Sequence, residues 1–330
     1  MRRSLWVLCA ATLMRSTAAA QASGIDPQCR ASTLSQRPAE DACQKGIDIF
    51  RYLAPQLGTS VVGGNAILGE SGALGGVGHV SLGIRGNMIF GRLPRADRVS
   101  ASITGAVVSD IPVVGQILAL PAVDAAIGLF PGVATAGARA LVLDALVSLA
   151  YVPPIRAHDV TISVPHGSVR LGAGGRLTLL DESIITPAIT VTYLRRTLPR
   201  VEVIASPGAD ELAVRDGTLE TAQWRAIVGK HLGALELTLG AGQDRYETGA
   251  SVTVRVQQGG QTFTGGPFDV SQAVTRTSAF AGASLDLARV RVGAEVGRVS
   301  GGTVATYNTF GRTRADDALL FASIGVRAHR

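Results

Sequence analysis

The sequence lacks the short motifs that would mark a zinc, serine-hydrolase or nucleotide site. Its 330 residues contain no H-E-x-x-H or H-x-x-x-H pair, no G-x-S-x-G turn and no G-x-x-x-x-G-K-[ST] loop. The triplet His166-Gly167-Ser168 leaves open a hydrolase embedded in a membrane, but a turn explains it better. We therefore expect no catalytic residues, no metal and no cofactor, and a protein that is not an enzyme.

Long apolar runs are also missing. A membrane-spanning helix needs about 20 apolar residues, and the run from Leu5 to Met14 is much shorter. It follows the basic Arg2 and Arg3 and precedes the small residues 18–22, which is the layout of a secretory signal peptide. We expect residues 1–22 to be cleaved and the protein to be exported.

No strong charge remains once this segment is removed. Without Arg2, Arg3 and Arg15, the 31 basic residues nearly balance the 25 acidic ones. The high pI therefore arises partly from the signal segment, and a nucleic-acid partner is not expected.

Cysteine is scarce, and only Cys29 and Cys43 follow the signal segment. In an oxidising compartment such a pair favours a disulfide. Residues 41–53 have apolar side chains at helical spacing, and Pro55 is expected to stop this helix. We interpret residues 23–56 as a stapled periplasmic cap or a plug.

The rest of the chain alternates apolar and polar residues with a period of two, which predicts β-strands. The clearest example is the hairpin 278–298, with a turn at 288–289. Similar segments predict strands at 58–70, 77–90, 123–129, 141–151, 169–179, 185–193, 221–228, 235–241, 252–256, 278–287, 290–296 and 320–327.

Two architectures share this pattern. A soluble sandwich buries its apolar face, whereas a transmembrane barrel turns that face to lipid and its small polar face to the lumen. Export, strands near the roughly 9–11 residues that cross a bilayer, and the edges that an open sheet would leave favour the barrel. The predicted fold is all-β: a closed antiparallel transmembrane barrel of about 12 strands (10–14) over residues 57–330.

Charged residues on the polar faces are the candidates for lining the lumen, where they would tune a pore or pair with one another in a closed interior. In a sandwich they would form a solvated face. They are Asp124, Asp144, Arg170, Arg176, Arg225, Glu236, Arg255, Arg291, Glu295 and Arg327.

The scarce aromatic residues, 5 % of the chain, offer a weaker signal. Tyr151, Tyr193, Trp224 and Tyr246 fit interfacial girdles and core packing about equally.

Signal segment, small N-terminal element and alternating strands to the last element together resemble a Gram-negative outer-membrane β-barrel protein. The N-terminal element is loosely similar to the plug of the long-chain fatty acid transporters. The resemblance implies an outer-membrane location, contact with lipid, and passive, porin-like transport of a small or hydrophobic solute. The alternative is a closed structural or surface-interaction barrel.

Loop positions conflict in part with this expectation. Counting back from a last strand that ends in the periplasm, 301–317 and 258–272 lie outside and the turn at 288 inside. The long segments 198–218 and 93–120 then also fall inside, where short turns are usual.

Overall fold

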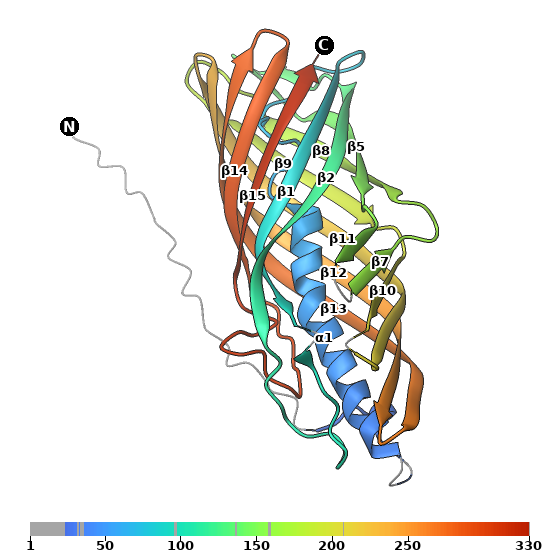
Figure 1. Ribbon diagram of the computed structural model, residues 1–330. Helices are drawn as coiled ribbons and strands as arrows, with labels where there is room; N and C mark the ends of the chain where they lie inside the picture. Colours follow the sequence, from blue (N-terminus) through green and yellow to red (C-terminus); the bar gives the residue numbers. More distant parts are fainter. Residues whose placement is uncertain are drawn as a thin grey trace, which may run out of the picture.

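The computed structural model describes residues 24–31, 33, 36–95, 98–135, 137–157, 160–206 and 208–329, so the expected signal peptide at 1–22 lies outside the described residues. The elements (Figure 1) are η1 (Pro27–Cys29), α1 (Arg37–Val62), β1 (Val80–Pro94), β2 (Val113–Phe130), β3 (Val133–Thr135), β4 (Ala138–Ala140), β5 (Val142–Tyr151), β6 (Ile155–Ala157), β7 (Val160–Ser163), β8 (Val169–Leu180), β9 (Ala188–Thr197), β10 (Val201–Ala205), β11 (Glu211–Leu232), β12 (Leu235–Gln258), β13 (Gln261–Leu287), β14 (Val290–Ser300) and β15 (Leu319–His329).

Ten strands close into a ring in which all neighbours are antiparallel. The order is β1-β2-β5-β8-β9-β11-β12-β13-β14-β15, and β15 pairs with β1. Closure leaves these strands no free edge within the ring. The expected closed antiparallel barrel is confirmed, at the lower end of the predicted range of 10–14 strands.

Two expected strands account for the smaller number and for the loop conflict. Segments 235–241 and 252–256 belong to one continuous strand, β12, and 58–70 is helix followed by irregular chain. Because the chain does not turn back between 241 and 252, one change of strand direction disappears from the count. Segments 198–218 and 93–120 then lie at the same end of the ring as 301–317. The four longest connections, 95–112, 152–168, 198–210 and 301–318, therefore lie at one end. The other end has the short turns at 233–234 and 288–289, the segment 181–187 and the β3–β4 hairpin.

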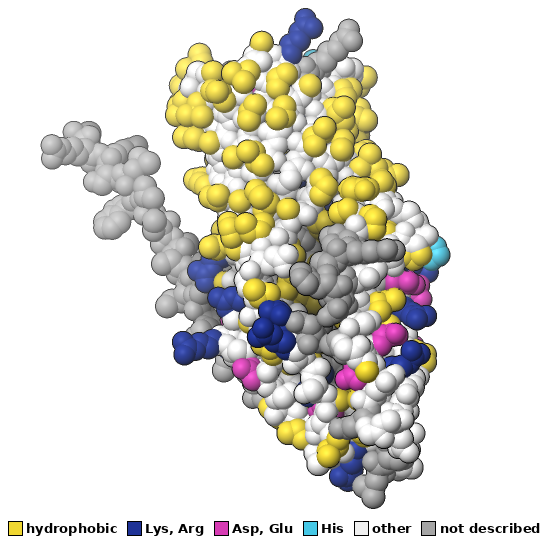
Figure 2. All heavy atoms as spheres, in the orientation of Figure 1, with side chains coloured by type: hydrophobic (Ala, Val, Ile, Leu, Met, Phe, Trp, Pro, Cys, Tyr) yellow, Lys and Arg dark blue, Asp and Glu magenta, His cyan; other side chains and the backbone are white. Residues whose placement is uncertain are grey.

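The outer face of the ring is apolar over the half that carries the short turns (Figure 2). Ile84, Leu239 and Val296 are 65 %, 66 % and 64 % exposed. We call this band the apolar belt; it includes Leu82, Ile84, Leu143, Leu149, Leu171, Val228, Leu237, Leu239, Val292, Val296, Ile324 and Val326. A band of this extent is far larger than soluble proteins expose, and lipid is the solvent that fits it.

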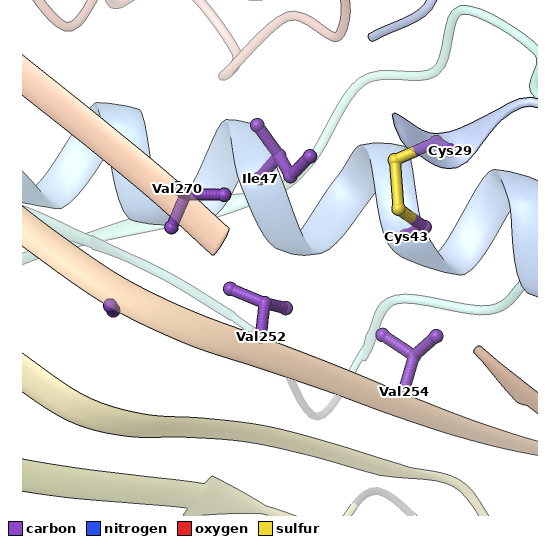
Figure 3. Close-up of a cluster of buried hydrophobic side chains, with 7 residues drawn as sticks. Cys29, Cys43, Ile47, Val252, Val254 and Val270 are labelled. Atoms are coloured by element: carbon purple, nitrogen blue, oxygen red, sulfur yellow. A yellow bond between two sulfur atoms is a disulfide. The ribbon is translucent and has the colours of Figure 1, made fainter. Parts of the chain in front are cut away.

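Beyond the belt the polarity of the wall is reversed. β11, β12 and β13 have 22, 24 and 27 residues, about twice what crossing a bilayer requires. We call their extension (211–223, 243–277), with the first half of α1 and the attached long loops, the projection. There the inward side chains Val252, Val254 and Val270 are buried against Ile47 of α1 (Figure 3). The core of the projection is therefore a sheet packed on a helix.

The disulfide between Cys29 and Cys43 staples η1 to α1 in this core (Figure 3). α1 then continues past Pro55, which was wrongly expected to stop it. An internal proline lacks the N–H that would donate to the carbonyl of Arg51, four residues earlier, and so costs the helix a hydrogen bond. Burial of Tyr52 and Val62 inside the ring supports the remaining turns. No helix in the described ranges is long and apolar enough to cross a membrane.

Candidate functional site: a filled lumen

Eight of the ten predicted lumen residues have their side chains inside the ring. Seven are buried and Arg291 is half-buried; the buried ones are Asp124, Asp144, Arg176, Arg225, Glu236, Glu295 and Arg327. They come from seven different strands and face inward because side chains alternate across each strand.

The other two lie elsewhere. Arg255 is in the projection, where the polar face of β12 is the outer one, and its exposed side chain lies 3.8 Å from Glu211. Arg170 is at the long-loop rim of β8, where its guanidinium donates to the backbone oxygens of His166 and Val169. Arg255 therefore does not line the lumen, whereas Arg170 shares the face of β8 that carries Arg176 but lies at its rim.

The lumen charges pair across neighbouring strands. Arg176 lies directly opposite Asp144 and binds it at 2.8 Å, and Arg85 binds Asp124 at 2.7 Å. Each pair offsets the cost of placing its charges away from water. Another fully buried pair joins Arg225 to Asp244 at 2.7 Å. This pairing suits a closed interior better than a solvated channel.

The N-terminal segment occupies the space that remains. We call the second half of α1 together with residues 63–74 the plug. Glu295 accepts from the backbone N–H groups of Gly64 and Asn65 at 2.8 and 2.9 Å. Arg225 donates to the oxygens of Gly63 and Gly64, both at 3.0 Å. Irregular backbone inside a membrane needs such partners, and the wall supplies them.

Further contacts continue toward the short-turn end. Glu236 accepts from both the backbone N–H and the hydroxyl of Ser71. Arg291 and Ser284 both donate to the oxygen of Gly69 at 2.8 Å. The lumen charges thus hold the plug as well as one another.

Sequence reasoning missed four interior residues of the same kind: Arg85, Arg196, Asp244 and Arg276. Arg85 lies on the polar face of its predicted strand, so the signal that found Asp124 could have found it. Arg196, Asp244 and Arg276 fall beyond the predicted strand ends, which were placed where the apolar alternation stops.

At the short-turn end, the turn between β8 and β9 is tied to β11. Glu182 accepts from the ring Nδ1 and the backbone N–H of His231 at 2.5 and 2.9 Å, and Lys230 lies 3.1 Å away. Burial alone would raise the pKa of Glu182, but these hydrogen bonds bring it below its ordinary value.

The wall has a discontinuity between β1, β14 and β15 at the long-loop margin of the belt. β14 ends at Ser300 and β15 begins at Leu319, while β13 and β1 continue past them. Loop 301–318 fills most of the gap and leaves a cleft of about 460 Å³. Its lining includes Tyr52 and Gln56 of the plug and Phe90, Arg92, Arg298 and Leu320 of the wall.

The aromatic residues divide between wall and lumen. Trp224 is 55 % exposed and its ring lies 4.6 Å from that of Tyr193 at the margin of the belt, as a girdle residue would. Tyr246 is buried, and its hydroxyl lies 3.3 Å from that of Thr59 in the plug. The interfacial alternative therefore does not apply to Tyr246.

The closed antiparallel ring, the apolar outer belt and the charged, filled interior define a transmembrane β-barrel of the Gram-negative outer-membrane type. No protein-family model matches the chain, and no curated protein sequence matches it. Similar solved structures include Neisserial surface protein A (NspA), 9 % identical, covering 76 % of this chain and 96 % of that one at a TM-score of 0.27. The Pseudomonas putida toluene transporter TodX is 10 % identical, with 76 % and 88 % covered at a TM-score of 0.29. At these scores the likeness carries no argument about function.

Proposed function

We propose that this chain is a closed outer-membrane barrel that holds its projection at the cell surface for interaction and performs no chemistry. The observation that carries this proposal is the filled lumen. Glu295, Glu236 and Arg225 bind the backbone of the plug, and the remaining interior charges pair across strands. Such an interior supports a structural role more directly than the flow of solute.

The orientation rests on the connections. Outer-membrane barrels have short periplasmic turns and longer external loops. The turns at 233–234 and 288–289 therefore belong on the periplasmic side, and the projection belongs outside. There the disulfide and the helix–sheet core give it a rigid shape without relying on the membrane.

Passive transport of a small or hydrophobic solute is the second candidate. It is favoured by the fact that the plug is one continuous segment that contributes no strand to the ring. It can therefore withdraw without opening the sheet. The wall cleft, which reaches Tyr52 and Gln56 of the plug, offers apolar solutes a lateral approach.

The conductance of the refolded full chain in a planar bilayer distinguishes the closed barrel from the passive transporter. The proposal expects insertion without channel steps, whereas steps in the full chain would overturn it. A variant lacking residues 24–74 should conduct, since it removes what fills the lumen.

The double variant Glu236→Gln/Glu295→Gln keeps the plug and weakens its anchors. An absence of channel steps in this variant supports the closed barrel. Channel steps that it shows and the parent lacks would favour a movable plug, and hence passage. Glu247→Gln on the outer face of β12 is the matched control.

A further inference from the structure

We propose that the wall cleft between β1, β14 and β15 binds an outer-leaflet lipid through its phosphate-bearing headgroup. The inference rests on the proposed orientation, with the barrel in a membrane and the projection outside, and does not depend on whether the lumen is open.

The first observation is the arrangement of side chains across three strands. Arg298 on β14 lies directly opposite Leu320 on β15. β15 pairs in turn with β1, where Ile89 lies opposite Phe321, so Phe90 is the outward neighbour of Leu320. Phe90 and Leu320 are 56 % and 57 % exposed. Arg298, Leu320 and Phe90 are thus neighbours across the three strands, and a cationic side chain lies next to two apolar ones.

The second observation is that two of the three arginines lining this cleft, Arg92 and Arg298, have no charged partner among the described residues. Their guanidinium groups form no ion pair or hydrogen bond with any residue that the structure describes; only the backbone of Arg92 is bonded, to Gln56. Elsewhere at the margin of the belt, exposed arginines are neutralised: Arg195 binds Glu220 at 2.5 Å and Arg245 binds Glu247 at 2.7 Å.

The other charges lining the cleft do not cancel this excess. Arg314 binds Asp316 at 2.9 Å, and the Asp317 carboxylate accepts from the backbone N–H of Arg314 at 2.9 Å. Asp317 offsets one charge at most, so the cleft stays cationic. Basic side chains gather along this margin of the hydrophobic area (Figure 2).

The third observation is depth. Phe90 and Leu320 belong to the belt, and Arg92 and Arg298 begin the polar wall beyond it on the side of the long loops. This is the headgroup level of the outer leaflet if the projection is external. A lipid phosphate there meets guanidinium groups that can donate paired hydrogen bonds, and its acyl chains lie on Phe90 and Leu320. A volume of about 460 Å³ suits part of such a molecule.

Native mass spectrometry of the full chain from detergent tests this with a phosphatidic acid, a phosphatidylcholine of the same chains, and inorganic phosphate. The parent should retain phosphatidic acid at least about tenfold more tightly than phosphatidylcholine. Arg92→Gln/Arg298→Gln should lose this preference, and Arg92→Lys/Arg298→Lys should keep most of it.

Arg195→Gln/Arg245→Gln, which removes the same charge from the paired arginines of the opposite wall, is the matched control and should behave as the parent. If the control lost the preference for phosphatidic acid to the same extent, the preference would depend only on the net charge of the protein, and the proposal would be overturned. So would equal retention of both lipids, or displacement of the lipid by millimolar inorganic phosphate, which would indicate a site for the free anion. Since all four arginines face outward, heat-modifiable migration on gels should show that each variant folds.

Discussion

Glu295 lies so close to Gly64 that no side chain fits between them. Its Oε1 accepts from the Gly64 N–H at 2.8 Å, and a Cβ on Gly64 would come within 2.7 Å of the same oxygen. The backbone of the plug is therefore in direct contact with the carboxylate of Glu295 on β14, and a side chain at position 64 would have to displace that carboxylate.

Gly64→Ala should accordingly destabilise the barrel. The added methyl displaces a carboxylate that also binds Asn65, and overpacking of this kind costs about 1–3 kcal/mol. Urea unfolding followed by fluorescence of Trp224 measures the loss. Gly86→Ala on β1 is the control, because a Cβ there meets nothing within 4 Å; equal effects of the two changes would contradict the close contact.

Removing Asp244 should cost more than removing an exposed carboxylate on the same strand. Arg225 and Asp244 are both fully buried, so Asp244→Ala leaves a buried cation without its counterion, at a cost of about 3–5 kcal/mol. Glu247→Ala breaks the exposed pair with Arg245 and should cost less than about 1 kcal/mol. Similar losses for the two variants in urea unfolding would mean that Arg225 is not enclosed.

The barrel itself could be predicted from the sequence, because period-two alternation determines which residues face lipid and which face the lumen. The sequence did not predict that the apolar side chains of the projection face inward, opposite to those of the belt. Val252 and Val254 show the same alternation as Leu237 and Leu239, yet they face a helix inside rather than lipid outside. The partner that covers Val252 and Val254 is α1, about 200 positions earlier in the chain, and two short predicted strands did not reveal that the apolar positions change face along one strand.

The plug was predicted only as a short element for a related reason. Pro55 is a sound local signal for the end of a helix, but tertiary burial of the following turns outweighs it. Gly63, Gly64 and Gly69 have no side chains and so contribute nothing to an apolar–polar pattern. Their backbone groups are what Glu295, Arg225 and Arg291 bind, so no alternation could have shown what these charges hold.

Opening the disulfide should loosen the projection and leave the belt intact. Cys29 and Cys43 are 14 residues apart, and closing a loop of this size stabilises by about 3 kcal/mol. In Cys29→Ala/Cys43→Ala, hydrogen exchange should accelerate around Ile47 and Val252 and stay unchanged at Leu239. Uniform acceleration along β12 would show instead that projection and belt unfold as one unit.

The turn held by Glu182 should weaken in acid. Its folded pKa lies below the ordinary value, so its contribution to stability is complete above the unfolded pKa of about 4.3 and is lost as the pH falls through the folded pKa. Glu182→Gln should therefore be less stable than the parent at pH 6, with the difference shrinking toward pH 3. A difference in unfolding free energy that does not vary over this range would contradict the role of the carboxylate.

The most direct test of the account is which end of the barrel faces outward in whole Gram-negative cells. Thr262 lies at the exposed tip of the projection and Arg289 in the short turn at the opposite end. Single-cysteine variants at the two positions can be treated with a membrane-impermeant maleimide before and after the cells are broken. We predict that Thr262→Cys is labelled on intact cells and Arg289→Cys only after breakage. Labelling of Arg289→Cys on intact cells, with Thr262→Cys protected, would place the projection in the periplasm and contradict a barrel built to display it.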